Sequence, residues 1–436
     1  MKYYSTNRQS PPATLEDAVI RSLAADSGLY MPERIPVLGS DIIRSLKDRP
    51  FHETASIVAE SFFGDDIDAG ALAAIVGDTL SFDTPVVHVH DSVYSLELFH
   101  GPTLAFKDVG ARFMARLLGY FIRRKGIGQT VNVLVATSGD TGSAVASGFL
   151  GIEGIRVFVL YPGGKVSPIQ EYQFTTLGQN ITALEIDGTF DDCQTLVKAA
   201  FADRELNSRM RLTSANSINV ARLIPQSFYY FDAYAQLDRA GKAGELIVCV
   251  PSGNFGNLSA GLFAAQMGLP VKRFIAANNR NDVFLTYLKT GKYEPRPSVA
   301  TIANAMDVGN PSNFARILDM FGHDHGAIAR SIAGYRYDDG EIARTMRLVF
   351  RNFNYLLDPH GACGYRALAD FGLQPHQTGL FLETAHPAKF KETADRILNV
   401  NIDIPDKLQA FMKGKKQSIP LSSDFGKFRD FLVENA

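Results

Sequence analysis

Cysteine, excess charge of either sign and long apolar runs are all scarce in this sequence, and each scarcity excludes a class of protein. Only three cysteines occur in 436 residues, at positions 193, 249 and 363. Their odd number and wide spacing argue against a disulfide framework and against cysteine-rich zinc sites. We therefore expect a protein of a reducing compartment, and we take that compartment to be the cytoplasm.

The balance of charges excludes a second group of partners. The formal net charge is −2, with basic residues scattered along the chain. This balance gives no electrostatic reason to expect binding to nucleic acid or to an anionic membrane. No apolar stretch approaches the roughly 20 residues that cross a bilayer, and the first residues lack the apolar core of a signal peptide. We expect no nucleic-acid partner and no membrane association.

The composition itself is that of an ordinary globular protein, with 46% hydrophobic and 21% charged residues. At roughly 100–200 residues per domain, the length suggests two to four domains. We expect residues 1–92 to form a separate, mainly helical domain. Thr14 can cap its first helix, and further helical patterns span residues 53–63 and 68–75.

From residue 93 onward, short apolar runs alternate with glycine loops and helical patterns. The runs cover residues 131–136, 155–160, 183–186, 246–250 and 273–277. Each is nearly all apolar, as expected of strands buried on both faces of a parallel sheet. We expect an α/β fold with two open parallel-sheet subdomains in residues 93–436. The smaller and mobile one lies at about 130–225, and the rest forms the larger one.

The glycine loop after residue 250 is the clearest local signal. An apolar strand runs into the sequence PSGNFGN, which opens a helix near Asn257. Gly253 and Gly256 allow close approach of the backbone to a ligand, and free amides at a helix start favour a phosphate. No lysine follows as in a P-loop, and the dinucleotide spacing is missing. A tight strand-to-helix turn without a ligand remains the alternative.

A second loop of this kind has the sequence ATSGDTGSA, between a strand and a helix. Ser138, Thr141 and Ser143 offer hydroxyl groups there, and Gly139 and Gly142 expose amides. The loop can hold a carboxylate or a phosphate, and a simply capped helix start is the alternative.

Lys107 directly follows the apolar stretch TLAF. Partial burial would lower the pKa of this amine and make it a better nucleophile for a Schiff base. A lysine that extends past a phenylalanine to solvent is the alternative.

Taken together, a lysine, a Ser-Gly-Asx-Thr loop and a glycine phosphate loop occur in an order that resembles pyridoxal-phosphate enzymes of the tryptophan synthase β fold. The finer details resemble the threonine synthase family along essentially the whole chain. The matching motifs are HGPTLAFKD around Lys107, ATSGDTGSA, SANSINVARLIPQ from Ser214, PSGNFGN from Pro251 and ETAHPAKF from Glu383. This resemblance implies the fold type II of these enzymes, with the N-terminal helical layer added.

The resemblance also implies roles for the matching positions. Lys107 would bind pyridoxal 5'-phosphate through a Schiff base and act in catalysis, and the hydroxyl of Thr384 would face the pyridine nitrogen. The remaining residues bind three groups. The cofactor phosphate would lie on Gly253, Asn254, Phe255, Gly256 and Asn257. The substrate carboxylate would lie on Ser138, Gly139, Asp140, Thr141 and Gly142. The substrate phosphate would lie on Asn216, Ser217, Asn219 and Arg222.

The reaction implied is the conversion of O-phospho-L-homoserine and water to L-threonine and phosphate, by a protein expected to be a monomer. A serine/threonine dehydratase is the alternative within the same class, although such an enzyme has no substrate phosphate to hold. A cofactor-binding protein without turnover is the alternative from another class, and the intact Lys107 argues against it.

Two further patterns could indicate an aspartic protease or a metal site, but each lacks a feature that such a site needs. Asp26-Ser-Gly and Asp140-Thr-Gly resemble the paired loops of aspartic proteases, but Asp140 lies between a strand and a helix. His88 with His90, and His323 with His325, could form metal sites, yet no motif of known ligand spacing accompanies them. We expect no metal. His100 lies near the Lys107 segment, and its pattern indicates no role.

Overall fold

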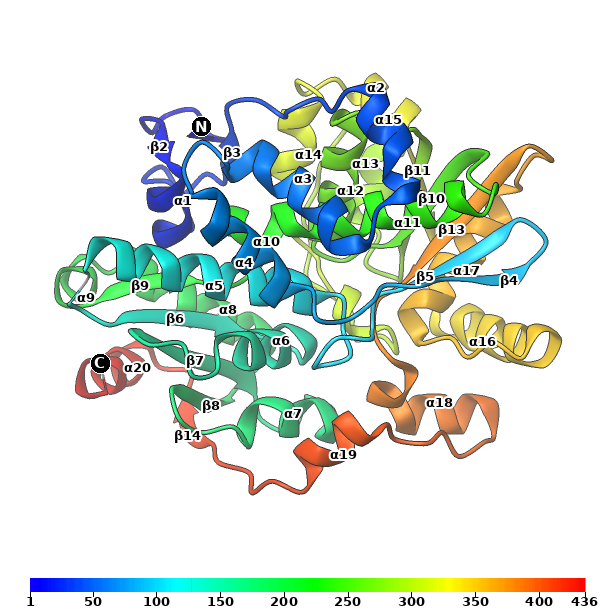
Figure 1. Cartoon of the computed structure of the whole chain (residues 1–436). Coiled ribbons are helices and arrows are strands. Elements are labelled where there is room, and N and C mark those ends of the chain that lie inside the picture. The colour runs from blue at the N-terminus through cyan, green and yellow to red at the C-terminus, as the bar shows by residue number, and fades with distance from the viewer. Residues whose placement is uncertain (127, 436) are drawn as a thin grey trace. The chain divides into compact units, whose positions relative to one another are not determined.

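The computed structural model describes residues 1–126 and 128–435, and it shows an α/β protein (Figure 1). Contacts within the chain divide it into two compact units. The first unit contains Met1–Met31, Lys107–Arg222 and Ile404–Ala436, and the second contains Pro32–Phe106 and Leu223–Asp403. No described helix combines the length and the apolar character that a membrane span requires.

The first unit is built on a five-stranded sheet in which every neighbouring pair of strands is parallel. Its strands, in spatial order, are β14 (Ile419–Ser422), β8 (Ile181–Asp187), β7 (Ile155–Pro162), β6 (Val131–Ala136) and β9 (Arg211–Ser214). The three central strands are the predicted apolar runs, and the prediction of buried parallel strands is confirmed for them. Both edge strands were missed, because they are short and β14 is partly exposed.

The two faces of this sheet are covered by different helices. Leu134, Phe158 and Leu184 belong to one buried cluster with residues of α8 (Phe190–Ala202) and α20 (Phe425–Glu434). The alternate residue Val159 contacts the opposite helix, α6 (Asp140–Phe149), as the two-residue period of a strand requires. The remaining helices of the unit are α5 (Lys107–Lys125), α7 (Pro168–Thr175), α9 (Arg204–Arg209), α10 (Val220–Leu223) and α19 (Asp406–Met412).

The second unit is built on a six-stranded sheet. Its order is β12 (Ile332–Arg336), β11 (Val271–Asn278), β10 (Glu245–Pro251), β13 (Gln377–Glu383), β5 (Val93–Glu97) and β4 (Val86–His90). All neighbours are parallel except β4, which pairs antiparallel with β5 at one edge. The predicted strands 246–250 and 273–277 are confirmed as β10 and β11 near the centre, so the phosphate loop follows a central strand.

The helices of the second unit connect its strands and cover its sheet. α17 (Pro359–Phe371) contacts four strands, and α12 (Gly256–Gln266) contacts β11. The other α-helices are α2 (Ser40–Ser45), α3 (Phe51–Phe63), α4 (Ala69–Thr79), α11 (Phe228–Arg239), α13 (Val283–Thr290), α14 (Phe314–Met320), α15 (His325–Ser331), α16 (Asp339–Phe353) and α18 (Lys391–Leu398). Short 3₁₀ turns are η1 (Leu46–Asp48), η2 (Ile224–Ser227), η3 (Asn304–Met306) and η4 (Pro387–Phe390).

The predicted N-terminal domain, residues 1–92, is divided between the two units by its contacts. Its first part contains β1 (Lys2–Ser5), β2 (Ala13–Thr14), β3 (Tyr30–Pro32) and α1 (Leu15–Arg21), and its second part contains α2, α3 and α4. Thr14 caps α1 as predicted, because its side chain accepts from the amide of Asp17. The boundaries at residue 92 and at about 130–225 stay a prediction about domains, whereas the units follow contacts alone.

A buried polar node explains why the first helix belongs with the five-stranded sheet. The side-chain amide nitrogen of Asn219, Nδ2, donates to the backbone carbonyl of Val19 and to the hydroxyl of Ser22, both at 2.8 Å. Ser22 in turn bonds both backbone groups of Ser214, at the end of β9. All these groups are buried, so each bond replaces one that water would otherwise supply.

We expect Asn219→Ala to lower the free energy of unfolding by about 2–3 kcal/mol, because it leaves buried partners without their donor. Urea unfolding followed by circular dichroism measures the change. Asn435→Ala, at an exposed position, is the control and should change the value by less than about 0.5 kcal/mol. Equal effects of the two variants would contradict the node.

Candidate functional site

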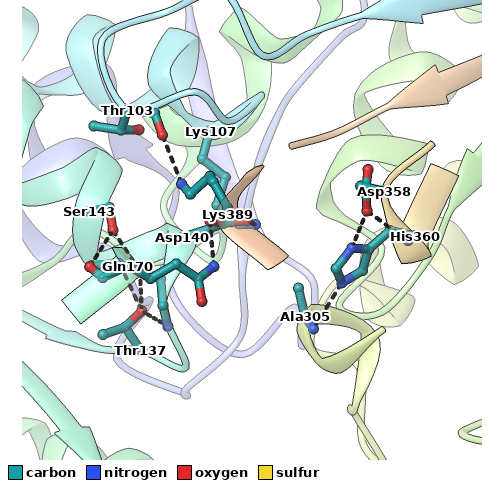
Figure 2. A network of polar contacts seen from close by, with 12 residues as sticks. Thr103, Lys107, Thr137, Asp140, Ser143, Gln170, Ala305, Asp358, His360 and Lys389 are labelled. Atoms are coloured by element: carbon teal, nitrogen blue, oxygen red, sulfur yellow. Dashed lines mark hydrogen bonds and ion pairs between the residues drawn. The ribbon is translucent and has the colours of Figure 1, made fainter. Parts of the chain in front are cut away.

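Lys107 is the first residue of α5, in the first unit. Its side chain is only 17% exposed, and its Nζ lies 4.0 Å from Oδ2 of Asp140, the first residue of α6. Figure 2 shows the two side chains together. The structure therefore places the predicted lysine beside the predicted Ser-Gly-Asp-Thr loop, with its amine shielded from most of the solvent.

The loop before α6 has a fixed shape. The hydroxyl of Thr137 accepts from the amides of Gly139 and Gly142, at 2.9 and 2.8 Å. Gly139 has a φ of 143°, and a Cβ there would lie 2.6 Å from the carboxamide of Gln170. That carboxamide also donates to Oδ1 of Asp140 at 2.7 Å (Figure 2). Only glycine fits at position 139, and the Asp140 carboxylate is held between Gln170 and Lys107.

The hydroxyl groups of this loop differ in what they bind. Ser143 donates to the carbonyls of Gly139 and Gln170, so its role is structural. Ser138 and Thr141 are half-buried, and their hydroxyls form no hydrogen bond with any residue in 1–126 or 128–435. These two hydroxyls, unlike that of Ser143, are available to a ligand.

The segment from Asn216 to Arg222 contributes a buried cation to the same unit. A Cβ on Gly110, in the first turns of α5, would lie 3.2 Å from Nε of Arg222. Burial lowers the pKa of Arg222 to about 10, and the charge of Asp108 opposes that shift. The guanidinium therefore stays charged at neutral pH, and it lies close to the helix that begins at Lys107.

The other members of that segment vary in burial. Asn216 and Ser217 are half-buried, and the amide of Asn216 donates to the carbonyl of Ala136 at 3.1 Å. Asn219 is fully buried and already bonded to Val19 and Ser22. Its contacts therefore support the segment, whereas Asn216 and Ser217 are the more accessible of the predicted ligands.

The predicted phosphate loop lies in the second unit, between β10 and α12. Gly253 has no room for a side chain, since a Cβ would lie 2.7 Å from Cα of Met306. Phe255 has a left-handed backbone with a φ of 59°, and its buried ring packs at 4.7 Å from that of Phe284. α12 begins at Gly256 and presents the unpaired amides of its first turn. This geometry is that of an anion cradle.

Asn257 is the side chain in this loop that points most clearly to a ligand. The hydroxyls of Tyr229 and Tyr230 both donate to its Oδ1, at 2.8 and 2.7 Å. They fix the orientation of the amide, so its nitrogen faces the other way. That nitrogen is buried and has no hydrogen-bond partner among the described residues. A buried donor of this kind at a helix start fits a cofactor phosphate.

Asn254 has a different part in the loop. Its Oδ1 accepts from the amide of Ser312 at 2.6 Å, and its carbonyl accepts from the side chain of Asn313 at 3.0 Å. Asn254 therefore joins the loop to the start of α14. Its backbone amide, rather than its carboxamide oxygen, is the group suited to an anion.

Thr384 directly follows β13 in the second unit and is buried. Its carbonyl accepts from the amide of Phe106 at 2.9 Å, and Phe106 directly precedes Lys107 in the sequence. The hydroxyl of Thr384 forms no hydrogen bond within the described part of the chain. This hydroxyl suits a neutral hydrogen bond to a ring nitrogen.

Several side chains that shape the site carry no sequence signal. Thr137, Gln170, Tyr229 and Tyr230 act through contacts between segments far apart in the chain. A second buried amine, that of Lys389, donates to the carbonyl of Thr103 at 2.7 Å (Figure 2). It lies in the ETAHPAKF motif, and the motif match alone could have indicated it.

Three of the four histidines considered for metal binding, His88, His90 and His325, have other partners. Nε2 of His88 lies 2.9 Å from the carbonyl of Asp91, and Nε2 of His90 lies 2.9 Å from the hydroxyl of Tyr365. His325 contacts the carbonyl of Tyr287. His100, which had no assigned role, pairs with Glu97 at 2.8 Å.

Comparison with known proteins covers the whole chain. A family model described as pyridoxal-phosphate dependent enzyme matches residues 80–379. The model of the threonine synthase N terminus matches residues 2–80, and that of the threonine synthase C-terminal region matches residues 361–432. The threonine synthases of Haemophilus influenzae and Escherichia coli K12 are 43% and 42% identical, over 100% of both chains in each comparison.

Solved structures agree with the sequence relatives. The crystal structure of threonine synthase from Escherichia coli matches with a TM-score of 0.93 at 42% identity, over 100% of both chains. The cofactor-bound threonine synthase from Brucella melitensis matches with a TM-score of 0.92 at 34% identity, over 100% of this chain and 99% of that one. A threonine deaminase shares only 16% identity at a TM-score of 0.55, over 72% of this chain and 96% of that one, which shows the fold alone.

The expected fold, with parallel sheets and a pyridoxal phosphate cofactor, is thereby confirmed. The chain belongs to the threonine synthase family of pyridoxal-phosphate-dependent lyases.

Proposed function

We propose that the protein converts O-phospho-L-homoserine and water to L-threonine and phosphate. The observation that carries the proposal is Arg222, a buried guanidinium that stays charged and packs against the helix beginning at Lys107. A cation in this place suits a substrate that carries its own phosphate. A dehydratase acts on a substrate without that group and has no use for it.

The residues of the second unit hold the cofactor. The amides of Gly256 and Asn257, with the free donor Nδ2 of Asn257, would bind its phosphate at the start of α12. The hydroxyl of Thr384 would donate a neutral hydrogen bond to the pyridine nitrogen. When bound, pyridoxal phosphate supplies an electron sink for charge that develops at the substrate carbons.

The loop before α6 would bind the substrate carboxylate. Ser138 and Thr141 offer hydroxyls that form no hydrogen bond with the described residues, and Thr141 also offers its backbone amide near the start of α6, whereas the amides of Gly139 and Gly142 are taken by Thr137. The carboxylate of Asp140 would repel a substrate carboxylate, but Gln170 and Lys107 hold it. Asp140 therefore contributes through its backbone amide, and Gly139 and Gly142 allow the close approach.

The segment after β9 would bind the substrate phosphate. Arg222 supplies the charge, and Asn216 and Ser217 supply donors from the more accessible part of the segment. We assign Asn219 an indirect part, because its amide is bonded to Val19 and Ser22.

Lys107 would hold the cofactor covalently before the substrate arrives and move protons afterwards. A free Nζ of Lys107 would then be placed to take a proton from the substrate Cα and to exchange one at Cβ. Phosphate leaves from Cγ, and water adds at Cβ. Asp140, at 4.0 Å, keeps Nζ oriented when it carries the extra proton.

We also propose that the protein works as a monomer in the cytoplasm. The three cysteines are buried and free, as suits a reducing compartment.

The purified protein should be yellow, with a colour that borohydride bleaches, and should release phosphate and threonine from phosphohomoserine in equal amounts. Lys107→Ala should lower turnover by at least about 10³-fold, because the proton-moving group and the covalent link are both lost. The exposed Lys198→Ala is the control and should match the wild type. A keto acid and ammonia in place of threonine would instead indicate a dehydratase.

Arg222→Lys should raise the KM for phosphohomoserine by roughly ten- to hundredfold, because an ammonium cannot grip phosphate with two parallel bonds. The cofactor Kd should stay within about twofold. The exposed Arg211→Lys, at the start of β9, is the matched control. Equal loss of substrate and cofactor binding would refute the assignment and indicate a structural arginine.

Thr384→Asp should change the product distribution toward transamination side products. A carboxylate holds a proton on the pyridine nitrogen and strengthens the electron sink, whereas the natural hydroxyl does not. Product analysis by chromatography measures the ratio of side products to threonine, with Thr384→Ser as the control that keeps the hydroxyl. An unchanged ratio in Thr384→Asp would count against this role.

A further inference from the structure

Two carboxyl groups and a histidine form a buried network in the second unit, and none of them has a role in the steps above. Asp358 and Glu383 are fully buried, and His360 is 2% exposed. Asp358 caps α17, His360 lies in its first turn, and Glu383 ends β13 directly before Thr384. Figure 2 shows His360 between Asp358 and the backbone of Ala305.

The partners of His360 define its state. Oδ1 of Asp358 accepts from Nδ1 of the ring at 2.5 Å and from the amide of the same residue at 2.7 Å. Nε2 accepts from the amide of Ala305 at 3.1 Å. Nδ1 must carry a proton in order to donate to the carboxylate of Asp358, and Nε2 must be unprotonated in order to accept from the N–H of Ala305. The ring is therefore neutral and in a single tautomer.

Ala305 belongs to the wall behind the phosphate loop. A Cβ on Gly253 would lie 2.7 Å from Cα of Met306 and 2.9 Å from the carbonyl of Ala305. The first glycine of the loop thus rests directly on the η3 turn. Any shift of that turn changes where the backbone of Gly253 can lie.

The same turn is fixed on its other side. Oδ1 of Asp307 accepts from the side-chain amide of Asn279 and from the hydroxyl of Thr301, both at 2.7 Å. The chain is therefore held just after Met306 by Asp307 and just before it by His360. Between these two supports lies the surface that Gly253 contacts.

Glu383 connects the network to the strand that carries Thr384. Burial and the adjacent Asp358, which also hydrogen bonds its side chain, raise the pKa of Glu383 well above its ordinary value. Oε1 of Glu383 and Oδ2 of Asp358 otherwise have no partner among the described residues. A proton on Glu383 that is donated to Asp358 would give both carboxyl groups a partner. Asp358 then accepts from Glu383 and His360 together.

We propose that His360, oriented by Asp358, is a positioning residue that sets the wall behind Gly253 and so tunes the affinity of the loop for the cofactor phosphate. Glu383, Asp358, His360 and Ala305 form a relay of contacts, in which Glu383 fixes the orientation of Asp358. The inference rests on the phosphate-binding role proposed for residues 253–257. Amides that cradle an anion must be held to within about 0.5 Å of the productive geometry, and this relay supplies that constraint.

Two variants of His360 separate its contacts. His360→Asn keeps a polar group near the position of Nδ1 and can bond Asp358, but it cannot reach Ala305. His360→Gln places an oxygen near the position of Nε2 and can accept from the amide of Ala305. Each apoprotein is titrated with pyridoxal phosphate and, separately, with pyridoxal, which lacks the phosphate. The melting temperature of each apoprotein is measured in parallel.

We expect His360→Asn to raise the Kd for pyridoxal phosphate by roughly ten- to hundredfold. This range is typical when a residue that orients a binding group, without touching the ligand itself, is removed. The Kd for pyridoxal should stay within about twofold, and His360→Gln should restore the phosphate-dependent affinity to within about threefold. The exposed His376→Asn, outside this network, is the matched control, and its affinity for both ligands should equal that of the wild type.

Equal losses in His360→Asn and His360→Gln would overturn the proposal, since they would show a packing role only. An unchanged Kd in His360→Asn would overturn it as well, and so would an equal loss for pyridoxal. These readouts measure cofactor affinity and need no turnover. A wild-type protein that binds the cofactor but forms no threonine would therefore contradict the proposed function while leaving this inference standing.

Discussion

The close approach of the backbone at Gly253 to the η3 turn is the constraint on which the second unit's site depends. No side chain fits between them, so the loop takes its shape from the wall behind it. Phe255 adopts a left-handed backbone, and its buried ring keeps the loop on the core. The helix that follows can then point its free amides and Nδ2 of Asn257 at one place. The cradle thus combines neutral donors with the helix dipole, without any charged side chain of its own.

The two proposed phosphate sites differ in a way that suits their ligands. A cofactor that is also held covalently needs correct orientation more than it needs high affinity from its phosphate site. Neutral donors provide that orientation. A substrate phosphate must be recognised on arrival and released as product, and a guanidinium provides long-range attraction with a bidentate grip. Arg222 is costly to bury, and the opposite charge of Asp108 reduces that cost. A buried arginine is therefore better explained by a ligand than by stability.

The sequence could predict the central strands and the two glycine loops, because both signals are local. Residues 131–136 and 246–250 are continuous apolar runs, and buried parallel strands have few other compositions. The glycines at 139 and 253 occur where a side chain would collide with Gln170 or Met306. The partners themselves could not be predicted. Asn219 bonds Val19 across 200 positions, and His360 bonds Ala305 across 55. No periodicity or spacing encodes such pairs, and the division of residues 1–92 between the two units rests on contacts of the same long-range kind.

The end of β13 shows how the fold avoids a charged side chain next to Thr384, the residue expected to bond the pyridine nitrogen. Glu383 is adjacent to Thr384, and an ionised carboxylate there would be a strong field beside a neutral hydroxyl. Burial next to Asp358 keeps Glu383 protonated instead. The amide and the ring of His360 both donate to Asp358, and a protonated Glu383 would add a third donor to the same carboxyl group. The Asp358 carboxylate thus bonds His360, which in turn bonds Ala305. The same proton that neutralises the strand end therefore also orients the histidine that supports the phosphate loop.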